Sequence, residues 1–150
     1  MPSQIKVDEI KNVAGQYKIK TNVFEGQTTA GSIALQGEGT ATTNLQQGLN
    51  KVWVNLDGAG TFNEAGDSFN VTSLNDGGTG HYGVTYTNVM SNALYCYTFG
   101  SLTSDNNSNN LVAKNDVAPP TSVLTIQGAN SSGNADDANQ ACATVNGDLA

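Results

Sequence analysis

Apolar and polar residues alternate in short runs along most of the chain after residue 50, a pattern typical of strands that are buried on one face. The clearest run covers residues 51–57, where Val52, Val54 and Leu56 share one face. Further strands are predicted at residues 67–74, 81–87, 93–99, 111–113, 122–127 and 140–145. Short strands that recur every 10–15 residues or so predict an all-β fold, an antiparallel β-sandwich. A partly closed barrel is the alternative.

The first 50 residues carry apolar positions too sparse for a core of their own. Ile5 and Val7, and then Tyr17 and Ile19, alternate with polar residues as in strands with one solvated face. Residues 43–48 predict a single helical turn, with Asn44 as its cap. We therefore divide the chain into an extended, strand-rich arm, residues 1–50, and a β-sandwich domain, residues 51–150. The residues expected to carry attachment and oligomerisation of the arm are Ile5, Val7, Tyr17, Ile19 and Phe24.

The net charge of the chain limits the classes of molecule that it can bind. The chain has a net charge of −7, with 6 Lys and Arg against 13 Asp and Glu, so it repels phosphate backbones and nucleic acid is excluded as the main partner. All but one of the lysines precede residue 52, which suggests separate tasks for the arm and the domain. Without a long apolar stretch or the apolar centre of a signal peptide, we expect synthesis in a cytoplasm and no membrane insertion.

Little in the sequence points to catalysis. His81 is the only histidine, and it follows a glycine-rich turn with no Gly-x-Ser-x-Gly motif in the chain, so we expect a hairpin residue and no general base. Glu64, Asp67 and Asp76 lie close in sequence, but in predicted turns, where Asp mimics the backbone. We expect no enzyme and no cofactor. No metal is expected either, because the acidic residues lack the spacing of a calcium loop.

Two further features remain open at this point. Cys96 and Cys142 are either two buried free thiols or a disulfide that joins two strands. Tyr95, Tyr97 and Phe99 alternate along one predicted strand. Their rings are either half of the sandwich core, which we favour, or a platform on which sugar rings stack.

One long stretch resembles a known family. Residues 51–61, with the sequence KVWVNLDGAGT, and residues 67–80, DSFNVTSLNDGGTG, followed by residues 82–90, look like a domain common in fibre and appendage proteins of tailed phages, especially aquatic ones. The opening residues 5–12, IKVDEIKN, look like the start of those proteins. The resemblance implies a structural protein of the virion, made in the host cytoplasm. It also implies a homotrimer.

The first function we consider is a tail-fibre or spike subunit that docks to other virion proteins through its arm and displays the β-sandwich to host-surface glycans. The alternatives are a capsid decoration or cement protein and a carbohydrate-binding module. A homotrimer would let identical arms cover one another's apolar residues. Recognition is expected on the polar loops at residues 75–80, 104–110 and 128–137. The residues expected to take part are Asn75, Asp76, Asp105, Asn106, Asn107, Asn130, Asp136 and Asp137.

Overall fold

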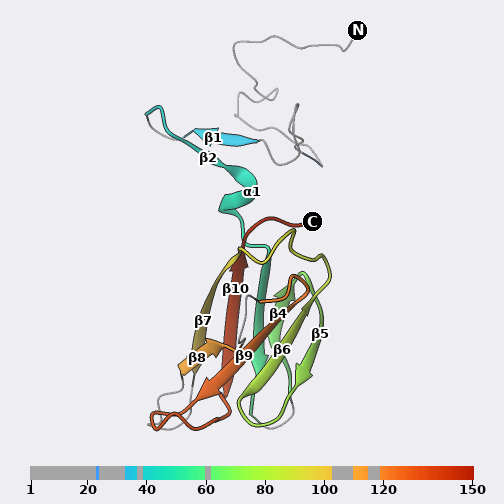
Figure 1. Ribbon diagram of the computed structural model, residues 1–150, viewed down its shortest axis with the longest axis vertical. Coiled ribbons are helices and arrows are strands. Elements are labelled where there is room, and N and C mark those ends of the chain that lie inside the picture. Colours follow the sequence, from blue (N-terminus) through green and yellow to red (C-terminus); the bar gives the residue numbers. More distant parts are fainter. Residues whose placement is uncertain (1–22, 24–32, 37–38, 60–61, 103–109, 115–118) are drawn as a thin grey trace, which may run out of the picture.

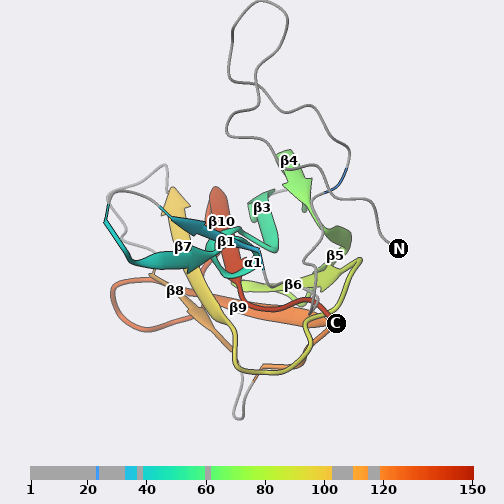
Figure 2. The ribbon, with the colours of Figure 1, turned by 90° about the horizontal axis from the view of Figure 1, so that it is seen from above.

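The computed structural model describes residues 23, 33–36, 39–59, 62–102, 110–114 and 119–150. In these residues the chain forms two four-stranded antiparallel sheets that pack face to face (Figures 1 and 2). Neither sheet closes on itself, so the predicted β-sandwich is confirmed and the barrel alternative is wrong.

The pairing of the strands assigns four of them to each sheet. The first sheet has the order β4–β3–β10–β7, with bounds Asn63–Phe69, Val52–Asp57, Gln140–Asn146 and Cys96–Leu102. The second sheet has the order β5–β6–β9–β8, with bounds Val71–Asp76, His81–Tyr86, Val123–Ala129 and Asn110–Ala113. The predicted strand alternation is therefore confirmed for β3, β6, β9 and β10, in which every second residue is buried.

The core lies between the inner faces of the sheets. It contains Val52, Val54, Leu56, Tyr82, Val84, Tyr86, Met90, Tyr95, Leu124, Ile126, Ala138, Ala141, Ala143 and Val145. Fully burying one such large aliphatic side chain contributes about 1.5–3 kcal/mol. Every buried apolar side chain among the described residues thus lies at or after Val52, in the part of the chain that we predicted to fold as the domain.

The predicted strand at residues 67–74 is wrong in one respect, because the chain changes sheets in its middle. Asn70 has a φ of 60°, which ends β4 in the first sheet and starts β5 in the second. Its amide donates to the carbonyl oxygens of Lys51 and Asn88, both at 3.0 Å, and its Oδ1 accepts from the Asn88 amide nitrogen at 2.7 Å. Phe69, which follows the same sequence alternation as Val71, is 53% exposed and pairs with Trp53 on the outer face.

The aromatic row at residues 95–99 packs as core. Tyr95 is buried, and Tyr97 and Phe99 pack against the core from β7, with ring centroids 6.3 Å and 5.2 Å apart in succession. β7 is an edge strand that begins at Cys96, and the residues on its opposite face are exposed to solvent.

The cysteines differ from both of our expectations. Both are free; Cys96 is exposed and Cys142 partly exposed. Cys142 pairs with Gly100, four residues along β7 from Cys96, a separation of roughly 13 Å at the rise of a strand. A disulfide needs Cα atoms about 4.4–6.8 Å apart, so these two thiols do not meet within one chain.

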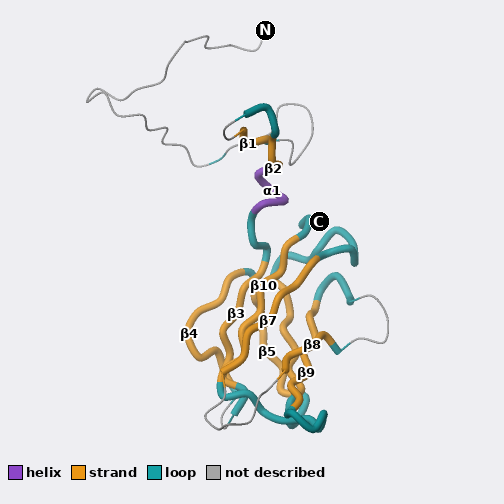
Figure 3. Tube along the Cα trace, turned by 90° about the vertical axis from the view of Figure 1, so that its left-hand side faces the viewer, coloured by secondary structure: helices purple, strands orange, loops and turns teal. Residues whose placement is uncertain are grey.

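The described part of the arm is more structured than an extended segment. A hairpin of β1 (Ala34–Gln36) and β2 (Thr42–Asn44) leads into the one-turn helix α1 (Leu45–Gly48), which stands off one end of the sandwich (Figure 3). The predicted helical turn is confirmed, because the Asn44 side chain accepts from the Gln47 amide nitrogen at 3.0 Å. The arm residues Ile5, Val7, Tyr17, Ile19 and Phe24 lie outside the described residues.

Side-chain hydrogen bonds attach this segment to the sandwich. The Gln47 side chain donates to Asp148 at 2.8 Å. The buried Lys51 donates from Nζ to the carbonyl oxygens of Gln46 and of Leu49, the latter at 2.7 Å. Burial lowers the pKa of Lys51, although the charge of Asp148 acts in the opposite direction. Residues on both sides of residue 50 therefore hold the arm at this end of the sandwich.

Candidate recognition surface

Two of the loops predicted for recognition, at residues 75–80 and 128–137, meet at the end of the sandwich opposite the arm (Figure 1). Gly80, which closes the turn between β5 and β6, donates from its amide nitrogen to Asp137 Oδ1 at 2.5 Å and accepts from the Gly128 nitrogen at 2.7 Å. The Asp136 nitrogen in turn donates to the Gly128 carbonyl at 3.2 Å. The structure thus brings the segments at 75–80 and 128–137 together into one bonded unit.

Side-chain oxygens of the predicted residues shape the loops themselves. Asp76 Oδ1 accepts from the Gly78 nitrogen at 2.8 Å. Asn130 Oδ1 accepts from the nitrogens of Ser132 and Asn134, at 3.0 Å and 3.1 Å. Local bonds of this kind are how Asp and Asn side chains stabilise turns. These oxygens are already engaged before any ligand arrives.

Asp137 has a deeper structural role. Its Oδ1 lies 3.4 Å from the Tyr82 hydroxyl, which accepts a hydrogen bond from the buried Ala138 nitrogen at 2.8 Å. Burial, the largest cause, raises the pKa of Tyr82, and the neighbouring Asp137 acts in the same direction. Asp137 therefore ties the loop to the core. The remaining predicted residues, Asp105, Asn106 and Asn107, lie outside the described residues.

A groove that the sequence analysis missed runs over the outer face of the second sheet, the face of β5, β6 and β9 that points away from the core. Its volume is about 550 Å³, within the range of roughly 300–1,000 Å³ that ligand pockets occupy. It is lined by Ser73, Leu74, Asn75, Gly77, His81, Tyr82, Gly83, Thr85, Ser122, Val123 and Thr125. Of the predicted recognition residues, Asn75 alone belongs to this lining.

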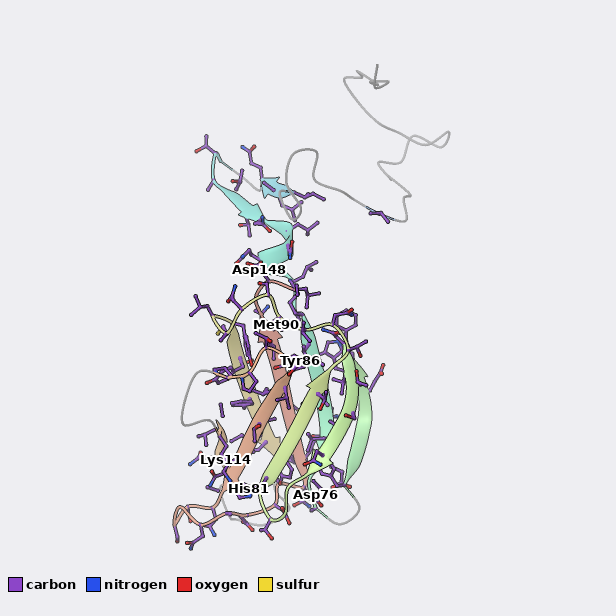
Figure 4. The ribbon with its side chains drawn as sticks, turned by 45° about the vertical axis from the view of Figure 1, so that its right-hand side comes forward. Asp76, His81, Tyr86, Met90, Lys114 and Asp148 are labelled. Atoms are coloured by element: carbon purple, nitrogen blue, oxygen red, sulfur yellow. The ribbon has the colours of Figure 1, made fainter. Side chains whose placement is uncertain are left out.

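The lining of the groove mixes polar and apolar groups and holds one histidine, His81. Hydroxyl and amide groups come from β5, β6 and β9, and no Asp, Glu or Lys is part of the lining. At one end, His81 Nε2 lies 3.0 Å from Lys114 Nζ, near Asp76 at the end of β5 (Figure 4). Such an arrangement can bind a hydrogen-bonding ligand. Our expectation that the chain is not an enzyme stays a prediction.

The signal for this groove was present in the sequence but ambiguous. His81, Gly83 and Thr85 occupy the outward positions of β6, and Thr125 occupies one on β9. Polar residues at alternate positions also describe an ordinary solvated face, so only the pairing of the strands shows that they surround one hollow.

Comparisons with protein families, with curated proteins and with solved structures find no match for this chain. Among the described residues, no group of three or more His, Cys, Asp or Glu side chains is placed to hold a metal ion. No helix in the described ranges has the length and apolar character needed to cross a membrane.

Proposed function

We propose that this protein is a non-enzymatic structural subunit of a phage virion, a tail fibre or spike subunit that docks through its arm and displays the β-sandwich outward. The observation that carries the proposal is the difference between the two ends of the sandwich. The arm joins at one end, and the loops at the other end are polar and bonded to one another.

The end that joins the arm has the character of an assembly surface. Leu49, Val89 and Leu94 are 54%, 39% and 91% exposed there, respectively. Backbone bonds place this surface beside the C-terminus, since the Ala150 nitrogen donates to Val89 at 3.0 Å and the Ser91 nitrogen to Asp148 at 2.8 Å. Exposed apolar side chains that gather near one another favour contact with another protein surface.

The occupant that fits this surface is the same end of other copies, in a homotrimer. The sequence of the arm contains the apolar residues Tyr17, Ile19 and Phe24, and identical arms wound about a threefold axis would bury residues of this kind together with Leu94. The net charge of −7 opposes association only weakly, because charges on outer faces are screened over about 8 Å at physiological salt.

The test of the function is where the protein sits and in how many copies. Immunogold electron microscopy and quantitative mass spectrometry of purified particles should find a few copies per particle, at the tail. Hundreds of copies over the capsid would replace the proposal with a decoration protein, and absence from particles would refute a virion role altogether.

The test of the trimer is light scattering on the full chain. We expect a mass near three times 15.5 kDa, and a monomer for the double variant Val89→Asp/Leu94→Asp. The matched control is Val112→Asp, which changes a residue that is 50% exposed on β8, away from the arm. A wild-type mass of one chain at micromolar concentration contradicts the trimer, as does equal behaviour of the variant and its control.

A further inference from the structure

We propose that the groove on the outer face of β5, β6 and β9 binds an uncharged oligosaccharide. This inference deepens the proposed function and rests on it for the source of the ligand, which would be a glycan of the host surface. Binding itself is a property of the isolated protein and is tested separately from any location in a particle.

The shape of the groove comes from a glycine in the middle of a strand. Gly83 on β6 pairs with Asn75 on β5 and with Thr125 on β9. These three residues form a row across the outer face in which the central position has no side chain and the two neighbouring positions do. A β-carbon at position 83 would lie 3.2 Å from Asn75 Cβ, closer than ordinary van der Waals contact. A glycine inside a strand contributes no packing, and it often marks a place where a ligand approaches the backbone.

The walls of the groove offer hydrogen-bonding groups that the protein does not use. Side chains of Ser73, Asn75, Thr85, Ser122 and Thr125 line it, and within the part of the chain that the structure describes they form no hydrogen bond. This contrasts with the loops, where Asp76 and Asn130 are bonded to neighbouring backbone. An apolar ligand would bury these groups unpaired, which costs free energy, whereas a sugar presents hydroxyls that both donate and accept.

The electrostatics favour a neutral sugar over an acidic one. No Lys, Asp or Glu lines the groove, while the whole chain carries −7 and repels anionic polymers at long range. Lys114 lies beyond the lining, against His81. Apolar surface, to which Leu74 and Val123 contribute, makes up the rest of the lining and suits the carbon-bound hydrogens of a sugar ring. The ligand class is therefore polyhydroxylated and uncharged.

The experiment is a glycan array of neutral and acidic oligosaccharides, followed by calorimetry with the best neutral binder. The probe protein is the full chain, compared with Gly83→Val, which fills the hollow, and with the double variant Ser73→Ala/Thr125→Ala, which removes two hydroxyls. The matched control is Gly100→Val, another outward glycine in a strand, where an added β-carbon would lie at an ordinary 3.9 Å from Cys142 Cβ. Circular dichroism checks that each variant is folded.

We expect the wild type and Gly100→Val to bind neutral oligosaccharides with similar affinity, which changes little between about 0.05 and 0.5 M salt. Both groove variants should bind at least about tenfold more weakly. No binding to any glycan, binding confined to acidic glycans, or equal binding by the double variant and wild type would each overturn the inference. Binding by a protein that is missing from phage particles would leave the groove intact and refute only the proposed function.

Discussion

Three buried tyrosines of the core differ in what their hydroxyl groups contact, and removing one oxygen from each should change stability in different directions. Tyr82, Tyr86 and Tyr95 are 1%, 4% and 8% exposed. The hydroxyl of Tyr82 accepts from the buried Ala138 nitrogen at 2.8 Å. The hydroxyl of Tyr95 donates to the Pro120 carbonyl at 2.9 Å. The hydroxyl of Tyr86 is buried with no partner at hydrogen-bond distance among the described residues, although it lies near enough to Tyr95 for each residue to shift the pKa of the other.

The expected magnitudes follow from those contacts. Tyr82→Phe leaves a buried N–H unpaired, so the free energy of unfolding should fall by about 1–3 kcal/mol. Tyr95→Phe removes the donor to the Pro120 carbonyl, but Pro120 is exposed and water can take the place of the hydroxyl. The free energy of unfolding should therefore fall by only about 0.5–1.5 kcal/mol. Tyr86→Phe removes a desolvated hydroxyl that has no partner at hydrogen-bond distance in the described part of the chain, so this variant should be more stable than wild type, by up to about 1–3 kcal/mol.

Urea unfolding followed by the fluorescence of Trp53, the single tryptophan, measures all three differences. The slope of free energy against urea must stay constant for the comparison to hold. Each kcal/mol should move the melting temperature by roughly 2–4 °C in a chain of this size. The reasoning is refuted if Tyr86→Phe is destabilised by about 1 kcal/mol or more, or if the three variants lose the same amount.

Three further measurements test other parts of the structure. Gly80→Ala should lower the free energy of unfolding in urea by about 3 kcal/mol or more, because φ is +68° and the new β-carbon would lie 2.5 Å from a carbonyl oxygen. The control Gly78→Ala, with a φ of +96° and open space around the new β-carbon, should lower it by only about 1 kcal/mol. Equal losses for the two variants would contradict the clash at Gly80. A thiol reagent at pH 8 should label exposed Cys96 before Cys142, whose pKa is raised by burial, and equal rates would refute this order. A chain of residues 51–150 should keep the circular dichroism of a folded sandwich, since the buried apolar core begins at Val52; an unfolded spectrum would make the arm part of the core.

The sequence pattern was sufficient to predict elements that follow one local pattern from their first residue to their last. β3 and β10 alternate from end to end, and the capped turn at Asn44 depends only on neighbours in sequence. The crossing at Asn70 could not be predicted in this way, because Phe69 and Val71 continue the alternation across the change of sheet. Only the bonds from Asn70 to segments about 18 residues away in either direction fix that crossing, and such partners are not visible in a local pattern.

The same limit explains why the loops looked like the recognition surface and the sheet face did not. Polar residues in loops are conspicuous in a sequence, yet the oxygens of Asp76, Asn130 and Asp137 bond to backbone that they hold in place. A polar side chain that is already engaged must give up a hydrogen bond before it can bind a ligand, so its net contribution to affinity is small. The groove around Gly83 carries hydroxyl and amide groups on paired strands, which are rigid and not engaged in this way. Preorganised groups of that kind lose less entropy when a ligand binds. Preorganised groups that make no hydrogen bond with the described residues therefore favour the sheet face over the loops as the surface for the glycan that we propose as the ligand.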